Sequence, residues 1–123
     1  MRMMLKGKIH RIRVTQVVPN YEGSIAIDEN LLDKADILQY EQVHILDVTN
    51  GSRFVTYAIE GKEGECSVNG AAAKLVEVGD ILIVCAYGIM NEEAAHESEP
   101  KVVKMRGVAG SNDCFIDYHC QPS

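Results

Sequence analysis

The dipeptide Asn50-Gly51, between two segments that alternate apolar and polar residues, constrains the fold most strongly. Asn-Gly is the most characteristic sequence of a tight β-hairpin turn. Val43–Val48 leads into it, and Arg53–Ile59 returns with a period of two. The return segment divides into two faces, Arg53, Val55, Tyr57 and Ile59 against Phe54, Thr56 and Ala58. The pattern therefore predicts a two-residue hairpin that presents an arginine and a tyrosine on one surface.

The other segments are also short and mostly strand-like. Apolar and β-branched residues between turn signals predict further strands at Lys8–Val17, Cys66–Val68, Ile81–Tyr87 and Lys101–Met105. In the first of these, one face is expected to carry Lys8, His10, Ile12 and Val14. Short helical segments are expected at Glu29–Ala35, Ala71–Leu75 and Glu92–Glu97. Asp28 and Asn91 are the expected N-caps, and Leu31 and Leu32 are expected to face inward.

About six short strands and two or three very short helices leave too little helix to cover a sheet. A small closed barrel is then the natural way to bury strands that alternate in polarity. The length of 123 residues fits one domain. The expected fold class is therefore mostly β with short helices, in a single domain of residues 1–105. Residues 106–123 follow no pattern and are expected to form a mobile tail.

Composition excludes several classes of function. The net charge of −6 argues against nucleic-acid binding, which needs a basic surface. No apolar run approaches the ~18–20 residues that cross a membrane, and charges interrupt the N-terminal segment, so we expect a cytoplasmic protein. Cys114, His119 and Cys120 match no compact zinc pattern, so no metal is expected.

Gly23-Ser24 is the most suggestive pair for chemistry, within the segment Asn20–Asp28. A residue without Cβ gives its carbonyl access to conformations that other residues avoid. A serine hydroxyl next to that carbonyl can attack it where the fold holds a strained geometry. That attack is the first step of a self-cleaving precursor. Gly-Ser is also common in plain turns, and the pair alone does not separate the two interpretations.

Further motifs accompany this pair in a fixed order: Gly7–Arg11, Val48–Phe54, Thr56–Ile59, Ser67–Ala73 and Val78–Ile81. As an ordered set they resemble the aspartate 1-decarboxylase family over roughly residues 3–105. The resemblance implies a double-psi β-barrel that assembles as a homotetramer. It also implies conversion of L-aspartate to β-alanine and CO2, for pantothenate and coenzyme A biosynthesis.

The resemblance implies cleavage between Gly23 and Ser24, which gives a small chain of residues 1–23 and a large chain from Ser24. Ser24 would become a pyruvoyl group that forms a Schiff base with the substrate, in place of pyridoxal phosphate. In some members a helper protein assists this maturation. Tyr57 matches the proton donor. Other matching positions are substrate-binding Arg53, Thr56, Lys8, Gly70, Ala71 and Ala72, and supporting His10, Asn69 and Tyr21.

Three alternatives to this function remain at this point. A small barrel can serve as a binding or adaptor module, although the acidic balance and the absence of a basic, aromatic-rich face argue against it. A hydrolase could be cut at the same bond and keep Ser24 as an N-terminal nucleophile. An inactive family member would carry substituted motif residues, whereas here they are intact.

Overall fold

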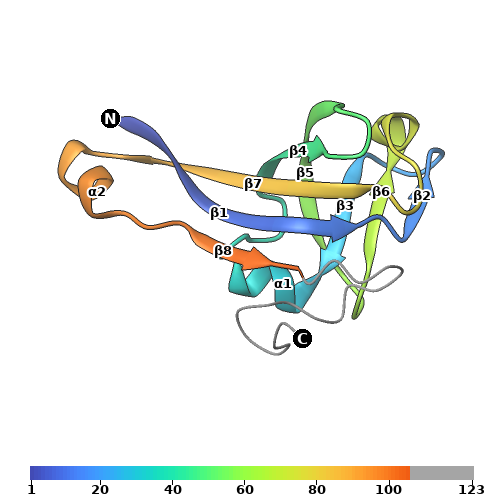
Figure 1. Cartoon of the computed structure of the whole chain (residues 1–123), viewed down its shortest axis with the longest axis horizontal. Helices are drawn as coiled ribbons and strands as arrows, with labels where there is room; N and C mark the ends of the chain where they lie inside the picture. Colours follow the sequence, from blue (N-terminus) through green and yellow to red (C-terminus); the bar gives the residue numbers. More distant parts are fainter. Residues whose placement is uncertain (106–123) are drawn as a thin grey trace.

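The computed structural model describes residues 1–105, which form a curled β-sheet with three short helices beside it (Figure 1). The predicted tail, 106–123, with Cys114, His119 and Cys120, lies outside the described residues. In chain order the elements are β1 (Arg2–Arg13), β2 (Gln16–Val18), β3 (Ser24–Asp28), α1 (Glu29–Lys34), β4 (Gln42–Asp47), β5 (Arg53–Gly61), β6 (Cys66–Asn69), the 3-10 helix η1 (Gly70–Leu75), β7 (Ile81–Met90), α2 (Glu92–Glu97) and β8 (Lys101–Lys104).

Hydrogen bonds join the strands of the described region into one eight-stranded sheet, in the order β2-β6-β3-β5-β4-β7-β1-β8. Most neighbours are antiparallel, whereas β2 with β6, β3 with β5, and β1 with β8 are parallel. The mostly-β fold with short helices is thus confirmed. Eight strands replace the expected six because the predicted Lys8–Val17 strand is divided into β1 and β2, and because β3 was not expected. Within residues 1–105, no ladder joins the edge strands β2 and β8.

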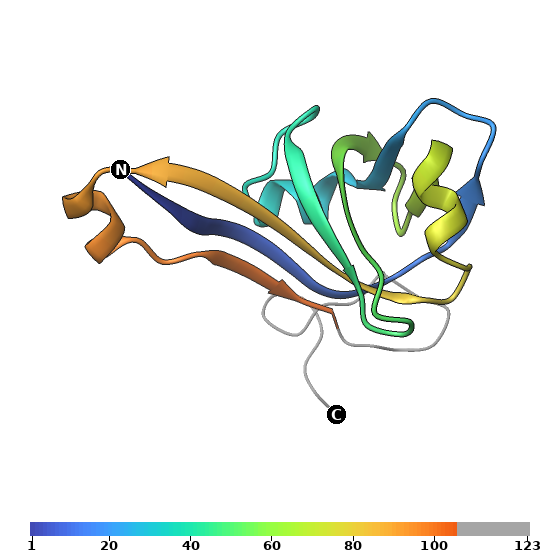
Figure 2. The same cartoon turned by 90° about the horizontal axis from the view of Figure 1, so that it is seen from above.

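β1 and β7 form a long antiparallel ribbon, whose far end projects from the body of the molecule (Figure 2). Their pairing runs from Arg2 opposite Met90 to Arg13 opposite Ile81. Both strands are longer than predicted, because each continues to satisfy the backbone of the other beyond the body. Helix α2 lies at the tip of this arm, where Glu92 forms an ion pair with Arg2 at 2.6 Å.

A β-bulge in β1 changes which of its residues face the core. The register shifts between His10 and Ile12, and Arg11 has a φ of 72°. The extra residue turns Ile12 to the same buried side as Ile9, although the two are an odd number of residues apart. The prediction that Ile12 and Val14 share the face of Lys8 and His10 is therefore wrong.

The core fills the inner side of the curled sheet and is closed by α1. Its largest fully buried side chains are Ile9, Ile12, Val14, Ile25, Ile27, Leu31, Leu32, Val43, Ile45, Val68, Leu82 and Val84. Inward-facing Leu31 and Leu32 are as predicted. Both predicted N-caps are confirmed, because Asp28 accepts a hydrogen bond from the Asn30 amide and Asn91 accepts one from the Ala94 amide.

The predicted β4–β5 hairpin is present, but its loop is longer than two residues. The Asp47 amide donates to the Ser52 carbonyl at 2.8 Å, and the Gly51 amide donates to the Asp47 carbonyl at 2.7 Å. The Asp47 carboxylate also accepts from the Thr49 amide, which favours a wider turn. The loop consequently spans residues 48–52, and only Gly51 of the Asn-Gly pair is in the left-handed region.

Close packing of β1 on the end of α1 predicts that Gly7→Ala is strongly destabilising. A Cβ at Gly7 would collide with the backbone carbonyl of Ala35, which cannot move without disturbing the core. We expect a loss of about 3 kcal/mol in the free energy of unfolding, measured by denaturant titration. Gly88→Ala, on the neighbouring strand, is the control, since its nearest contact would be the flexible Lys6 side chain at 3.6 Å. Equal losses in both variants would contradict this packing.

Candidate active site

Most of the predicted site side chains lie on the outer face of the sheet. Along β5, exposed and more buried residues alternate, and Arg53, Val55 and Tyr57 are exposed. Thr56 pairs with buried Val43, which places its side chain on the inner face. The predicted division of this strand into two faces is therefore confirmed.

The strand register brings Asn69, Ser24 and Tyr57 together on this outer face. Ser24 pairs with Asn69 across β3 and β6, and Ile25 pairs with Ala58 across β3 and β5. One residue before that last pair, Ser24 lies beside Tyr57. Adjacent strands are about 4.8 Å apart, and laterally paired residues point to the same face. Ser24, the predicted cleavage serine, and Tyr57, the predicted proton donor, are therefore neighbours, although their elements are far apart in the sequence.

The Ser24 hydroxyl is held in a buried polar contact. Ser24 is 2% exposed and Asn69 4% exposed. The Asn69 Nδ2 donates a hydrogen bond to Ser24 Oγ at 3.0 Å. This bond holds the Ser24 hydroxyl in one position, on the residue that directly follows the Gly23 carbonyl.

Gly70 supports the Gly23–Ser24 turn from behind. Gly70 has a φ of 72°, in the left-handed region, at the start of η1. A Cβ at this position would lie 2.7 Å from the Gly23 Cα and 2.9 Å from the Gly23 nitrogen. Gly23 itself does not have a positive φ, so the backbone conformation that requires glycine lies at Gly70. Exposed Ala71 and half-buried Ala72 follow in η1.

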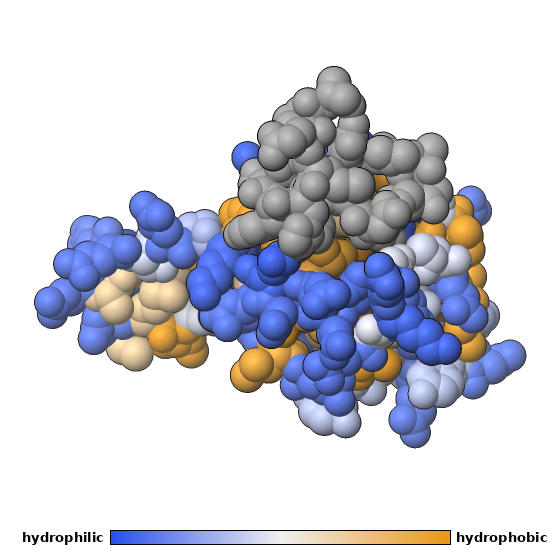
Figure 3. Space-filling view, turned by 90° about the horizontal axis from the view of Figure 1, so that it is seen from below, coloured by the Kyte–Doolittle hydropathy of each residue, from blue (hydrophilic) through white to orange (hydrophobic). Residues whose placement is uncertain are grey.

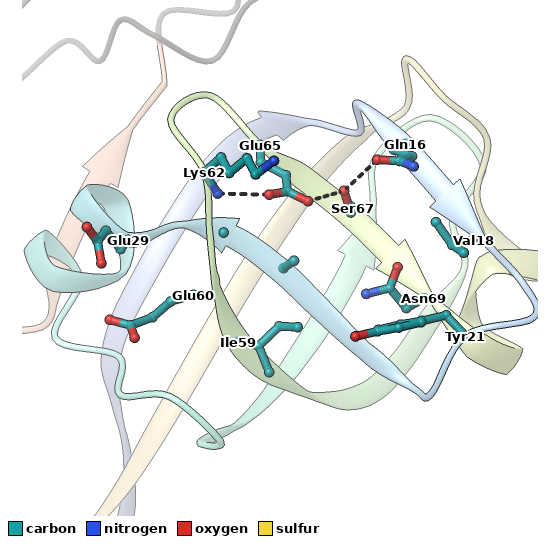
Figure 4. Close-up of a pocket in the computed structure, with 12 residues that line it drawn as sticks. Gln16, Val18, Tyr21, Glu29, Ile59, Glu60, Lys62, Glu65, Ser67 and Asn69 are labelled. Carbon is teal, nitrogen blue, oxygen red and sulfur yellow. Dashed lines mark hydrogen bonds between the residues drawn. The ribbon is translucent and has the colours of Figure 1, made fainter.

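A cavity of about 590 Å³ opens on the same face (Figure 4). Tyr21 and Asn69 lie at one end of it, Glu29 and Glu60 lie at the opposite end, and its upper edge in Figure 4 is lined by Gln16, Glu65 and Ser67. The Ser67 hydroxyl donates to Glu65 at 2.6 Å. Sequence reasoning missed these last three residues. The available signal was the period of two in β6, which places Ser67 on the face of Asn69.

Lys8 and His10 lie on the outer face but far from Arg53 within one chain. His10 pairs with Ile83, Ile83 with Leu46, and Leu46 with Arg53. Three strand spacings of about 4.8 Å separate the first and last residues of this row, or about 14 Å. The structure of a single chain thus assembles Ser24, Asn69, Tyr57, Tyr21 and Gly70, and leaves the predicted cations Lys8 and Arg53 apart.

The surroundings of His10 favour its neutral form. Burial lowers the pKa of His10, and the positive charges of Lys8, Arg11 and Lys104 lower it further. Its Nδ1 atom is buried and has no hydrogen-bond partner among the described residues. The positive side chains around it make this end of β1 attractive to an anion.

Two properties of the described residues bear on cofactors and membranes. Among residues 1–105, no group of three or more His, Cys, Asp or Glu side chains could hold a metal ion. None of the helices described is long and apolar enough to cross a membrane.

Comparisons with known proteins point to one family. The aspartate decarboxylase family model matches residues 1–110. Aspartate 1-decarboxylase of Thermoanaerobacter pseudethanolicus is 53% identical over 104 residues, covering 83% of this chain and 89% of that protein. Aspartate 1-decarboxylase of Stenotrophomonas maltophilia strain R551-3 is 52% identical over 115 residues, covering 89% and 91%. Aspartate 1-decarboxylase of Desulfitobacterium hafniense strain Y51 is 55% identical over 104 residues, covering 83% and 82%.

The contact between Gly70 and Gly23 predicts that Gly70→Ala displaces the Gly23–Ser24 turn. The new methyl group would overlap backbone atoms that cannot rotate away. We expect cleavage after Gly23 to slow at least tenfold, measured by intact mass over time. Gly64→Ala is the control, because Gly64 also has a positive φ, of 75°, but open space around its Cβ position. Equal slowing in both variants would mean that backbone strain, not this contact, is responsible.

Proposed function

Because this chain belongs to the aspartate decarboxylase family, we propose that it converts L-aspartate to β-alanine and CO2, for pantothenate and coenzyme A biosynthesis. The main support is the family match together with the buried contact between Asn69 and Ser24. An enzyme of this biosynthesis is expected in the cytoplasm.

We propose that the chain first cleaves itself between Gly23 and Ser24. Ser24 Oγ attacks the Gly23 carbonyl carbon and the peptide nitrogen leaves it, which converts the peptide to an ester. Loss of the Ser24 α-proton then expels Gly23 as a carboxylate and leaves a dehydroalanine, and one water converts this to a pyruvoyl group and ammonia. The hydrogen bond from Asn69 supports the first step, because it fixes the attacking oxygen.

The surroundings of position 24 fit a pyruvoyl group. Ser24 is buried, and the Asn69 amide is placed to donate to an oxygen there. Once formed, this group supplies the electron sink that decarboxylation needs, which pyridoxal phosphate supplies in other enzymes. The large chain would begin at position 24, and residues 1–23 would remain bound through β1 and its ladders.

Roles for the other residues follow from where the fold places them. Tyr57, beside Ser24 in the ladder, would deliver the proton that replaces CO2. Thr56 and Tyr57 both line a cavity of about 530 Å³, although their side chains lie on opposite faces of β5, and the substrate-binding role of Thr56 rests on its match to the family. The Arg53 guanidinium would bind a substrate carboxylate through two parallel hydrogen bonds. Gly70, Ala71 and Ala72 would offer backbone groups to the substrate. Tyr21 would shape the wall of the cavity of about 590 Å³.

We propose a homotetramer as the active assembly. The outer face and the arm expose apolar side chains, among them Met3, Val55, Tyr87 and Ile89. On the side drawn in Figure 3, hydrophobic residues of the arm are visible among hydrophilic ones. A neighbouring copy would cover such surface. It would also bring Lys8 and His10 of one chain toward the site of another chain. Within a single chain, these two residues lie far from Arg53.

Ser24→Ala is expected to abolish cleavage and decarboxylation, because no hydroxyl remains to attack the Gly23 carbonyl. Intact mass under denaturing conditions should show two wild-type fragments, split after residue 23, with a carbonyl in place of the amine on the larger one. Ser52→Ala, in the β4–β5 loop, should cleave normally. A Ser24→Ala protein that still releases CO2 from aspartate would refute the pyruvoyl mechanism.

The same mass measurement separates the remaining functions. A larger fragment that keeps a free N-terminal serine would indicate the N-terminal-nucleophile hydrolase. A single uncut chain would be tested again in the presence of a helper protein of the kind that assists maturation in some family members. If it still does not cleave, a binding module or an inactive family member becomes the better interpretation.

Tyr57→Phe is expected to cleave normally but to lose turnover, since the phenol proton is needed only after CO2 has left. A decrease in kcat of about 10²–10⁴-fold is typical when a general acid is removed. Tyr40→Phe is the control, because the Tyr40 ring lies 6.3 Å from that of Tyr57 and the substitution removes only a hydroxyl. Full turnover in Tyr57→Phe would show that another group donates the proton.

A further inference from the structure

Two carboxyl groups meet in a buried position where strand β4 leads into the β4–β5 loop. Asp47, the last residue of β4, is 2% exposed, and Asp80, just before β7, is 7% exposed. The two carboxyl groups lie within hydrogen-bonding reach of each other. Neither residue has a role in the proposed reaction, and both are costly to bury as anions.

Among residues 1–105, the hydrogen bonds around the two carboxyl groups leave one buried oxygen atom without a donor. Asp47 Oδ1 accepts from the amides of Thr49 at 2.8 Å and Asn50 at 3.2 Å. Asp80 Oδ2 accepts from the Glu77 amide at 3.1 Å. Asp47 Oδ2 is buried and has no donor among the described residues. Two carboxylates have no hydrogen to share, whereas one proton between them would satisfy this oxygen.

Electrostatics agree with a retained proton. Burial, followed by the hydrogen bond and the negative charge of Asp80, raises the pKa of Asp47 from 3.8 to about 6. Within residues 1–105, three segments that adjoin the pair each carry a charged side chain near it. Arg13 of β1 donates a hydrogen bond to the Gly79 carbonyl. Glu77, in the loop of residues 77–80, is exposed, and Arg53 is the first residue of β5. Residues 48–52 carry no titratable side chain.

Hydrogen bonds connect this pair to η1. The Asn50 Nδ2 donates to the Leu75 carbonyl at 3.0 Å, at the end of η1. The Ile81 amide donates to the Thr49 hydroxyl at 3.1 Å. At its other end, η1 begins with Gly70, which contacts Gly23. The loop that Asp47 organises therefore holds one end of the helix that supports the cleavage turn.

We propose that Asp47 and Asp80 share one proton and form a pH-sensitive latch, which fixes the 48–52 loop and, through Asn50, holds η1 against the Gly23–Ser24 turn. Loss of the proton leaves two like charges in contact, which repel each other and loosen the loop. Because the folded-state pKa is raised, the stabilisation is complete below pH 3.8 and is lost as the pH rises through about 6.

Asp47→Asn tests the latch directly. The asparagine Oδ1 can keep both amide hydrogen bonds, and its Nδ2 supplies a permanent donor to Asp80. We expect the folding equilibrium constant of the wild type, relative to Asp47→Asn, to fall by up to about a hundredfold between pH 4 and pH 7, since a pKa shift of two units corresponds to that factor. Asp80→Asn should behave similarly, and exposed Asp33→Asn is the control. A ratio that does not change with pH would overturn the proposal.

Hydrogen exchange tests the connection to η1 without using activity. In the wild type, the amides of residues 70–76 should exchange at least tenfold faster at pH 7.5 than at pH 5, after correction for the intrinsic pH dependence. In Asp47→Asn this excess should disappear. Equal corrected rates in the wild type at both pH values would overturn the link between the pair and η1.

The consequence for maturation depends on the proposed function. If the chain cleaves itself, the ratio of wild-type to Asp47→Asn cleavage rates should fall as the pH rises from 5 to 7.5. A constant ratio would refute the link to the cleavage turn. Absence of cleavage in every variant would count against the proposed function, and the unfolding and exchange measurements would still decide on the latch.

Discussion

Burial of β3 on both of its faces is the constraint on which the rest of the site depends. All five residues of this strand are buried, and it is paired on one side with β5 in parallel and on the other with β6 in antiparallel. Ile25 and Ile27 enter the core, whereas Ser24 and Ala26 lie on the opposite face and are buried as well. A slip of one residue would exchange the two sets, so hydrophobic burial itself fixes where Ser24 points.

The position of Ser24 then decides which groups can act together. Asn69 contacts the serine, and Tyr57 occupies the neighbouring position on β5, because two ladders with different directions meet on β3. Gly70 reaches Gly23 because β6 ends there and η1 begins. The Gly23–Ser24 bond thus lies where three segments converge, and each is held by backbone hydrogen bonds instead of flexible side chains. Such support suits chemistry that depends on small displacements.

Local patterns in the sequence predicted what local physics controls. The caps at Asp28 and Asn91 and the two faces of β5 each depend on residues within a few positions of one another. The bulge at Arg11 was not predictable, because arginine has no preference for a positive φ and the long-range pairing imposes it. β3 was missed because five residues next to a turn carry little periodic signal, and its partners lie more than thirty residues away.

The candidate site shows the same boundary between local and long-range information. The resemblance pointed to Ser24, Tyr57 and Asn69, and the structure brings these three together. No pattern could connect Asp47 with Asp80, since they meet only when β4 and β7 pair.

The acidic pair also raises a question of energy, because a buried carboxylate costs stability that an amide at the same place would not. Asparagine at position 47 would keep both amide contacts and remove the repulsion, so a chain under pressure for stability alone has a simple alternative. An acid differs from asparagine here because the strength of its contact with Asp80 can change with pH. Here the contact lies at the far end of η1 from Gly70, on a path of backbone and amide hydrogen bonds. In the proposed latch, a proton at this position therefore adjusts the support of the Gly23–Ser24 turn without touching the residues to which the reaction is assigned.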